Sequence, residues 1–85
     1  MLHAVLRDEE IQKAGKAVAG ELRRRREAIG LSRNGLAQRA GISVQSVCFI
    51  ENGTNSPSLS TLLRICGALN VKLQTVLRCA KNSDA

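Results

Sequence analysis

Four segments of the chain carry apolar residues three or four positions apart, the spacing that gives an α-helix one apolar face. The pattern predicts helices over about 17–28, 33–40 and 44–51, and a fourth with Leu59, Leu62, Leu63, Cys66 and Leu69 on one face. A serine stands directly before each of the last three helices, where its hydroxyl can accept a hydrogen bond from the first turn. These serines are Ser32, Ser43 and Ser58.

The two ends of the chain carry weaker patterns. Helical spacing continues upstream into residues 8–16, but Gly15 and Gly20 each weaken a helix by about 1 kcal/mol relative to alanine. We therefore expect residues 1–16 to be a loosely held N-terminal extension. In the segment 71–79, apolar and polar residues alternate and β-branched residues are frequent, which favours a β-strand over a fifth helix. Residues 79–85 are expected to fray.

Length and composition bound the fold. With 85 residues, the chain can enclose one hydrophobic core. Its apolar residues are almost all aliphatic, because it has one Phe and no Trp or Tyr, and such a core favours packed helices over a β-sandwich. We predict one all-α domain of four or five helices over 17–78. If the segment 71–79 is a strand, it pairs with its counterpart across a homodimer.

The balance of charge suits a polyanionic partner. The formal net charge is +6, and phosphates attract Lys and Arg and release counterions on contact. Four of the 13 basic residues form the run 23–26, and consecutive helical side chains point about 100° apart. These arginines therefore cannot all face the core; some could reach a DNA backbone, and a solvated face explains them equally well. Charge permits nucleic-acid binding without proving it.

Little in the sequence points to catalysis, a metal or a cofactor. The three cysteines, Cys48, Cys66 and Cys79, lack Cys-x-x-Cys spacing, and His3 is the only histidine. No paired carboxylates and no nucleophile with a matching base stand out, so we expect no enzymatic activity. Reduced thiols, the lack of a signal peptide and the lack of 18 consecutive apolar residues predict a soluble cytoplasmic protein.

The stretch LAQRAGISVQSV, residues 36–47, has the properties of two helices joined by a tight turn. Ala37 allows the helices to cross at close range, and Gly41 can take the left-handed backbone conformation that a short turn needs. Val47 packs the second helix back onto the first. This arrangement is typical of a helix-turn-helix motif, here about 33–52, whose second helix presents its N-terminal residues to the DNA major groove.

Four pieces of the chain, in the same order, resemble the phage-repressor class of bacterial helix-turn-helix proteins, the Cro/CI-like or XRE family. They are LRRRREAIGLS, LAQRAGISVQSV, FIENG and SPSLSTLLRICGALNV, and the resemblance runs from about Val18 to Leu77. It implies a compact bundle of four or five helices that binds double-stranded DNA, usually as a homodimer on a two-fold-related operator. The implied function is a sequence-specific transcriptional regulator.

The resemblance also implies roles for residues of the third helix. Family members read bases with the first, second and sixth residues of that helix, which here are Val44, Gln45 and Phe49. A glutamine can bond to adenine through both N6 and N7, and apolar side chains can pack on thymine methyl groups. Phe49 has an alternative role as a core or dimer residue, because it is the only aromatic residue of the chain.

A second set of residues is implied at the DNA backbone. Arg33 stands where family members often contact phosphate from the start of the second helix. Arg26 and Glu51 match a family ion pair between the first and third helices, and Glu51 is the sole acid between positions 28 and 83. Other expected phosphate contacts flank the groove and also suit capping or turn positions. They are Ser43, Ser46, Asn52, Thr54 and Asn55.

Two other functions stay open. The stretch from Ser58 through CAKN resembles the antitoxin of the high-persistence toxin–antitoxin pair, in which a strand after the fourth helix pairs across the dimer. That resemblance implies an antitoxin that represses its own operon and binds a kinase-fold toxin. The apolar residues Val44 and Phe49 also suit a protein-interaction module that has kept the scaffold without binding DNA.

Overall fold

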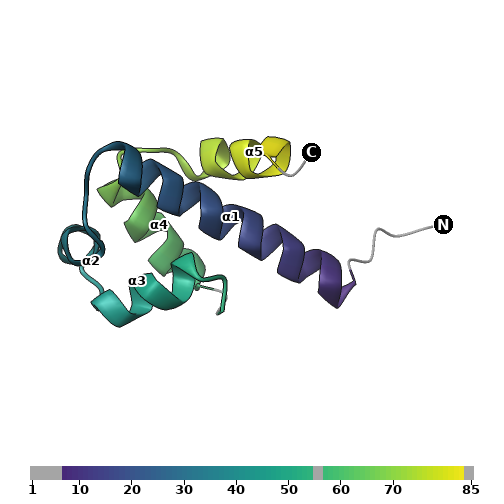
Figure 1. The fold of residues 1–85 in the computed structure, drawn as a ribbon, viewed down its shortest axis with the longest axis horizontal. Helices are drawn as coiled ribbons and strands as arrows, with labels where there is room; N and C mark the ends of the chain where they lie inside the picture. Colours follow the sequence, from purple (N-terminus) through teal and green to yellow (C-terminus); the bar gives the residue numbers. More distant parts are fainter. Residues whose placement is uncertain (1–6, 55–56, 84–85) are drawn as a thin grey trace.

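Five α-helices and no strand make up the described part of the chain, residues 7–54 and 57–83 of a computed structural model (Figure 1). In chain order the helices are α1 Asp8–Ala28, α2 Arg33–Ala40, α3 Val44–Glu51, α4 Leu59–Ala68 and α5 Leu73–Ser83. The predicted all-α class is confirmed, and the number of helices is five.

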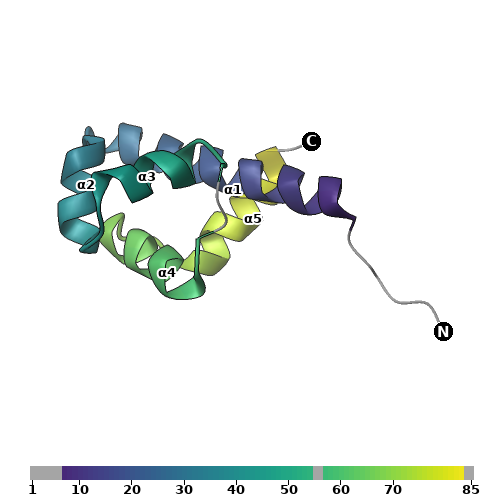
Figure 2. The ribbon, with the colours of Figure 1, turned by 90° about the horizontal axis from the view of Figure 1, so that it is seen from below.

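The long helix α1 supports the other elements. α5 packs along it, α2 and α3 form a pair at its C-terminal half, and α4 closes the bundle against α2 and α5 (Figures 1 and 2). The first turns of α1 project beyond the bundle, and the side chains of residues 8–16 are exposed. The pair α2–α3 is therefore held by α1, which contacts α3, and by α4, which contacts α2.

The core is aliphatic, as the composition predicts. The buried cluster draws on all five helices and consists of Leu22, Leu36, Ala37, Ala40, Val47, Ile50, Ile65, Cys66, Leu69 and Val76. Burial raises the pKa of the Cys66 thiol, with the nearby Arg25 guanidinium acting in the opposite direction. Cys66 therefore stays protonated at neutral pH and packs as a small apolar residue.

The serines expected at helix starts are all N-caps. The Oγ atoms of Ser32, Ser43 and Ser58 accept hydrogen bonds from the backbone N–H groups three residues later, at 2.9, 3.0 and 3.1 Å. Each bond satisfies an N–H group that has no partner within its helix. The structure places α2 and α3 at the predicted positions 33–40 and 44–51.

The strand expected over 71–79 is wrong, because Leu73–Ser83 is helical. Leu73, Val76 and Ala80 lie three and four residues apart, and Val76 and Ala80 are buried. Packing of that face on α1 and α4 selects the helix. A helix also bonds its own backbone groups, whereas a lone strand would leave them without partners inside the molecule.

The ends of the helical bundle also differ from expectation. Residues 8–16 belong to one continuous helix with residues 17–28, and the Arg7 N–H donates to Glu10 Oε1 at 3.0 Å at its start. Residues 79–83, expected to fray, are part of α5, while 1–6 and 84–85 lie outside the described residues.

The apolar face of α4 is turned from the predicted direction. Leu59 and Leu63, expected to face inward, are 64% and 50% exposed, while Ile65 is buried beside Cys66. The bundle therefore presents a pair of leucines on its surface at the N-terminal half of α4.

Candidate nucleic-acid interface

The turn between α2 and α3 depends on Gly41. Its backbone is left-handed (φ +72°, ψ 34°), and its N–H donates to the carbonyl of Ala37. The N–H of Ile42 donates to the same carbonyl at 3.0 Å. Ala37 is 5% exposed and Val47 is fully buried, and both belong to the core cluster that packs α3 against α2. The turn at Gly41 and this packing together fix the direction in which α3 leaves α2.

The N-terminal end of α3 carries two hydroxyl groups. Ser43 Oγ accepts from the Ser46 N–H and donates to Ser46 Oγ, at 3.0 and 2.8 Å. Ser43 is exposed and Ser46 is half-buried. The capping role of Ser43 is therefore present in the structure, and both oxygens lie at the end of the helix whose free N–H groups favour anions.

The outer face of α3 is formed by Val44, Gln45 and Phe49. Val44 is 41% exposed and Phe49 is 39% exposed, and Gln45 is also exposed. At about 100° per residue, these three side chains fall within less than half a turn of the helix. Phe49 therefore does not occupy the core. The opposite face is buried and consists of Val47, Ile50 and Glu51.

A buried ion pair ties the end of α1 to the end of α3. Arg26 Nε donates to Glu51 Oε2 at 2.6 Å, and Arg26 Nη2 donates to Glu51 Oε1 at 3.0 Å. The Glu51 side chain is 2% exposed. Hydrogen bonding to Glu51 raises the pKa of the Arg26 guanidinium, although burial acts against it. Arg26 Nη1 also donates to the Leu31 carbonyl at 2.7 Å, which anchors the connection to α2.

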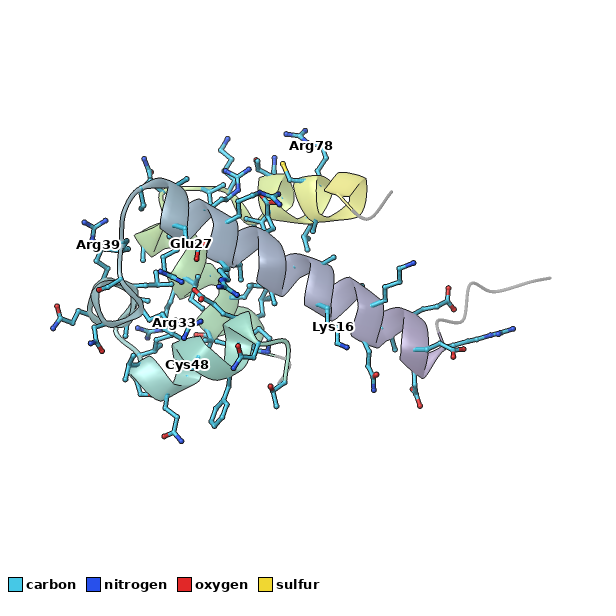
Figure 3. All side chains as sticks on the ribbon, viewed as in Figure 1. Lys16, Glu27, Arg33, Arg39, Cys48 and Arg78 are labelled. Carbon is cyan, nitrogen blue, oxygen red and sulfur yellow. The ribbon has the colours of Figure 1, made fainter. Side chains whose placement is uncertain are left out.

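Arg33 joins this pair from the first turn of α2. Its Nε lies 3.3 Å from Glu51 Oε1, and its side chain is 39% exposed (Figure 3). Two guanidinium groups therefore share one carboxylate, which leaves a formal excess of one positive charge at this corner of the motif. The contact of Arg33 with Glu51 was not predicted. A signal for it existed, since Glu51 is the only acid in a long basic stretch.

The turn after α3 is formed by Asn52, Gly53 and Thr54. The N–H groups of these residues donate to carbonyls in the last turn of α3, at 3.0 to 3.1 Å. Asn52 and Thr54 are exposed, and Gly53 has a left-handed backbone with φ +70°. The expected phosphate contacts thus lie at both ends of α3. Ser43 and Ser46 lie at its N-terminal end, and Asn52 and Thr54 follow its C-terminal end. Asn55 lies outside the described residues.

The arginine run on α1 is occupied by contacts within the protein. Arg23 Nε lies 3.2 Å from Glu27 Oε2, and Arg25 Nε lies 2.6 Å from Glu21 Oε2. Arg24 also pairs with Glu21, which is buried, and Arg25 Nη2 donates to Cys79 Sγ on α5 at 3.3 Å. Arg26 pairs with Glu51, as described above, so each of the four arginines has a carboxylate partner. Arg25 and Arg26 therefore help to pack α1 on α5 and α3, whereas Arg23 and Arg24 stay exposed and pair with acids of α1 itself.

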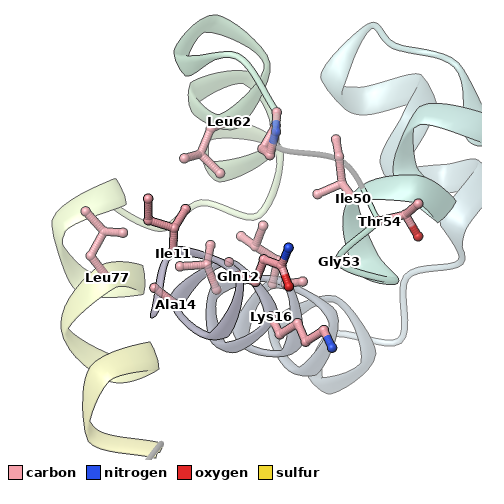
Figure 4. A pocket seen from close by; sticks show the side chains of 14 residues that line it. Ile11, Gln12, Ala14, Lys16, Ile50, Gly53, Thr54, Leu62 and Leu77 are labelled. Atoms are coloured by element: carbon pink, nitrogen blue, oxygen red, sulfur yellow. The ribbon is translucent and has the colours of Figure 1, made fainter. Parts of the chain in front are cut away.

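An apolar groove lies between the projecting part of α1, the turn after α3, and helices α4 and α5 (Figure 4). Its volume is about 580 Å³, and Ile11, Val18, Leu62 and Leu77 are among its lining residues. Within residues 7–54 and 57–83, no group of three or more His, Cys, Asp and Glu side chains could hold a metal ion. Among the described helices, none has the length and apolarity needed to cross a membrane.

Known proteins with the same architecture include regulators of gene expression. The profile of the helix-turn-helix family matches residues 22–76. The clp gene regulator ClgR from Corynebacterium glutamicum superposes with a TM-score of 0.79 at 28% identity, over 85% of this chain and 92% of that one. The restriction-modification controller protein C.AhdI from Aeromonas hydrophila gives 0.70 at 30% identity, over 72% and 92%.

A third structure, the hypothetical transcription factor NHTF from Neisseria, superposes with a TM-score of 0.72 at 28% identity, over 91% of this chain and 84% of that one. No curated protein sequence gives a significant match. The matched region includes both helices of the motif, the turn between them, the supporting helix α4 and the first turn of α5. This chain belongs to the helix-turn-helix family.

Proposed function

We propose that this DNA-binding helix-turn-helix protein is a sequence-specific transcriptional regulator, with α3 as the helix that enters the major groove. The observation that carries the proposal is the division of α3 into a buried face and an outer face formed by Val44, Gln45 and Phe49. A helix held in this way can present its outer face to base edges. The regulatory roles named for ClgR and C.AhdI support the same function.

The residues of the outer face suit two kinds of contact with DNA bases. The Gln45 amide can bond to adenine N6 and N7 together, which is worth about 1–3 kcal/mol of discrimination against another base. Val44 and Phe49 have no polar atoms in their side chains, and both can pack on thymine methyl groups. We therefore expect the preferred site to contain A·T pairs beneath α3.

Phosphate contacts would hold α3 in register from both of its ends. At the N-terminal end we propose Ser43 and Ser46. Arg33 would contact phosphate nearer the other end, because its partly exposed guanidinium lies beside Glu51, the last residue of α3. At the C-terminal end we propose Asn52, Thr54 and Asn55. Such contacts carry no base information, but they fix the depth and angle of the recognition helix.

We further propose that the protein works as a homodimer on a two-fold-related site. Two exposed leucines on α4, Leu59 and Leu63, support this, because exposed apolar pairs on a small domain mark interaction surfaces. The double variant Leu59→Glu/Leu63→Glu should sediment as a monomer while keeping its helical signal. Ile29→Glu, at an apolar residue 54% exposed elsewhere, is the matched control and should leave the mass unchanged. A dimer that survives the double change would exclude this surface.

The antitoxin alternative has less support than the regulator. It depended on a strand after the fourth helix, and that segment is the helix α5. A protein-interaction role has one favourable observation, the exposure of the apolar residues Val44 and Phe49. That role and the regulator differ in one measurable property, which is binding to duplex DNA.

Selection of bound fragments from random duplex DNA tests the proposed function. A regulator should enrich a defined, two-fold-related sequence, and its affinity should fall steeply with salt because phosphate contacts release counterions. Enrichment without a shared sequence would contradict specific recognition. Failure to bind any duplex at low salt would favour the interaction module.

A further inference from the structure

We propose that Lys16 is a further contact with the DNA backbone, binding a phosphate beside the C-terminal end of α3. Lys16 lies in the projecting part of α1, ahead of the region 22–76 that matches the family. The inference rests on the proposed function and adds to it a residue outside the motif. It also assigns a role to the extension of α1.

The Lys16 side chain lies directly over the turn that follows α3. A Cβ atom built on Gly53 would come within 3.1 Å of Lys16 Cγ and 3.6 Å of Lys16 Cα. Figure 4 shows Lys16 beside Gly53 and Thr54. Gly53 therefore serves two needs at once, since its left-handed backbone forms the turn and its missing side chain makes room for the lysine stem.

The charge of Lys16 is available to an external anion. Arg23 to Arg26 and Arg33 all contact carboxylates, whereas no carboxylate forms an ion pair with Lys16 in residues 7–54 and 57–83. Lys16 is also exposed. A long aliphatic stem that packs on the protein while its ammonium stays in solvent is a typical arrangement for lysine.

The turn that Lys16 covers needs such a charge if it is to bind phosphate well. Its own exposed side chains, Asn52 and Thr54, are neutral and can only donate or accept hydrogen bonds. A lysine adds the positive charge that releases a counterion from the duplex. Lys16 and the turn would then hold the same strand of DNA where it leaves α3.

A matched control exists on the opposite side of the molecule. Arg78 is exposed on α5 and points away from α1 and α3, whereas Lys16 lies on the α3 side of α1 (Figure 3). Lys16→Gln and Arg78→Gln each remove one positive charge from an exposed helical position. The two variants therefore change the net charge equally but affect different faces.

The experiment compares these variants, in the full chain, by titrating a duplex of random sequence at several salt concentrations. For Lys16→Gln, the slope of log affinity against log salt should become shallower by about 0.9 per protomer. Arg78→Gln should retain the slope of the unaltered protein, and Lys16→Arg should restore it. Circular dichroism of each variant establishes that the helices are intact.

The outcomes separate this inference from the proposed function. Equal slopes for Lys16→Gln and Arg78→Gln, with salt-dependent binding otherwise intact, would overturn the role of Lys16 and leave α3 as the reading helix. If the unaltered protein did not bind duplex DNA, both proposals would be overturned. A loss of slope confined to Lys16→Gln supports the backbone contact.

Discussion

The two faces of α3 differ in burial and in their contacts with the rest of the protein. On the inner face, Val47 is fully buried, Ile50 is 6% exposed and Glu51 contacts two arginines from other helices. On the outer face, Val44 and Phe49 keep about two-fifths of their surface exposed. Packing of the inner face therefore fixes the position of α3, whereas the side chains of the outer face are available to contact another molecule.

This difference predicts that stability and DNA recognition depend on different residues of one eight-residue helix. Substitutions on the inner face should lower the free energy of unfolding, because they create cavities or leave charges without partners. Substitutions on the outer face should leave stability almost unchanged and alter DNA binding. The division can be tested residue by residue.

The largest effect is expected from Glu51→Ala. This change leaves Arg26 buried without its carboxylate, at a cost of about 3–5 kcal/mol in the free energy of unfolding. Urea denaturation followed by circular dichroism measures the loss.

Glu27→Ala is the control for Glu51→Ala. Glu27 is another acid paired with an arginine, but its side chain is 54% exposed, so its removal should cost less than about 1 kcal/mol. Similar losses for the two variants would show that the buried pair does not anchor α3.

A smaller effect is expected from Val47→Ala. Removal of two buried methyl groups should lower the free energy of unfolding by about 2 kcal/mol. Val44→Ala makes the same chemical change on the outer face and should cost less than about 0.5 kcal/mol. If Val44→Ala destabilised the protein as much as Val47→Ala, the two faces would not be distinct.

The central helices were predictable because their local signals agree with their tertiary contacts. Ser32, Ser43 and Ser58 mark helix starts, and each forms the capping bond that its position indicates. Gly41 likewise has the left-handed backbone that the turn requires. At these positions the chemistry of one or two residues decides the local structure, so the sequence alone is sufficient.

The segment 71–79 was not predictable in the same way. Val71, Leu73, Thr75 and Leu77 alternate as in a strand, yet Leu73, Val76 and Ala80 also share one face of a helix. Both patterns fit so short a segment. Contact with α1 decides between them, because it buries Val76 and Ala80 together.

Which face of α4 packs inward also depends on tertiary contacts. The side of α4 that is buried in the bundle carries Ile65 and Cys66, so Leu59 and Leu63 stay exposed. Sequence spacing identified an apolar stripe on α4, but not which of its edges faces the core.

At the interface too, local geometry was predictable from the sequence and contacts between helices were not. The residue types and spacing in α3 indicated which side chains belong to its outer face, because helical geometry fixes their directions. The third partner in the ion cluster, Arg33, depends on the angle between α2 and α3. The position of the Lys16 side chain over the turn depends on the path of α1 past Gly53. Neither this angle nor this path can be predicted from the local sequence.

The most direct test of the proposal that the outer face of α3 reads bases uses Gln45→Ala. The unaltered protein and this variant are titrated with the selected duplex, with copies in which each base pair is replaced in turn, and with random DNA. We predict that the unaltered protein loses about 1–3 kcal/mol of binding free energy at one A·T pair and that Gln45→Ala no longer distinguishes that pair, while its other preferences and its stability persist. Equal weakening of selected and random DNA by Gln45→Ala would contradict base reading by the outer face of α3.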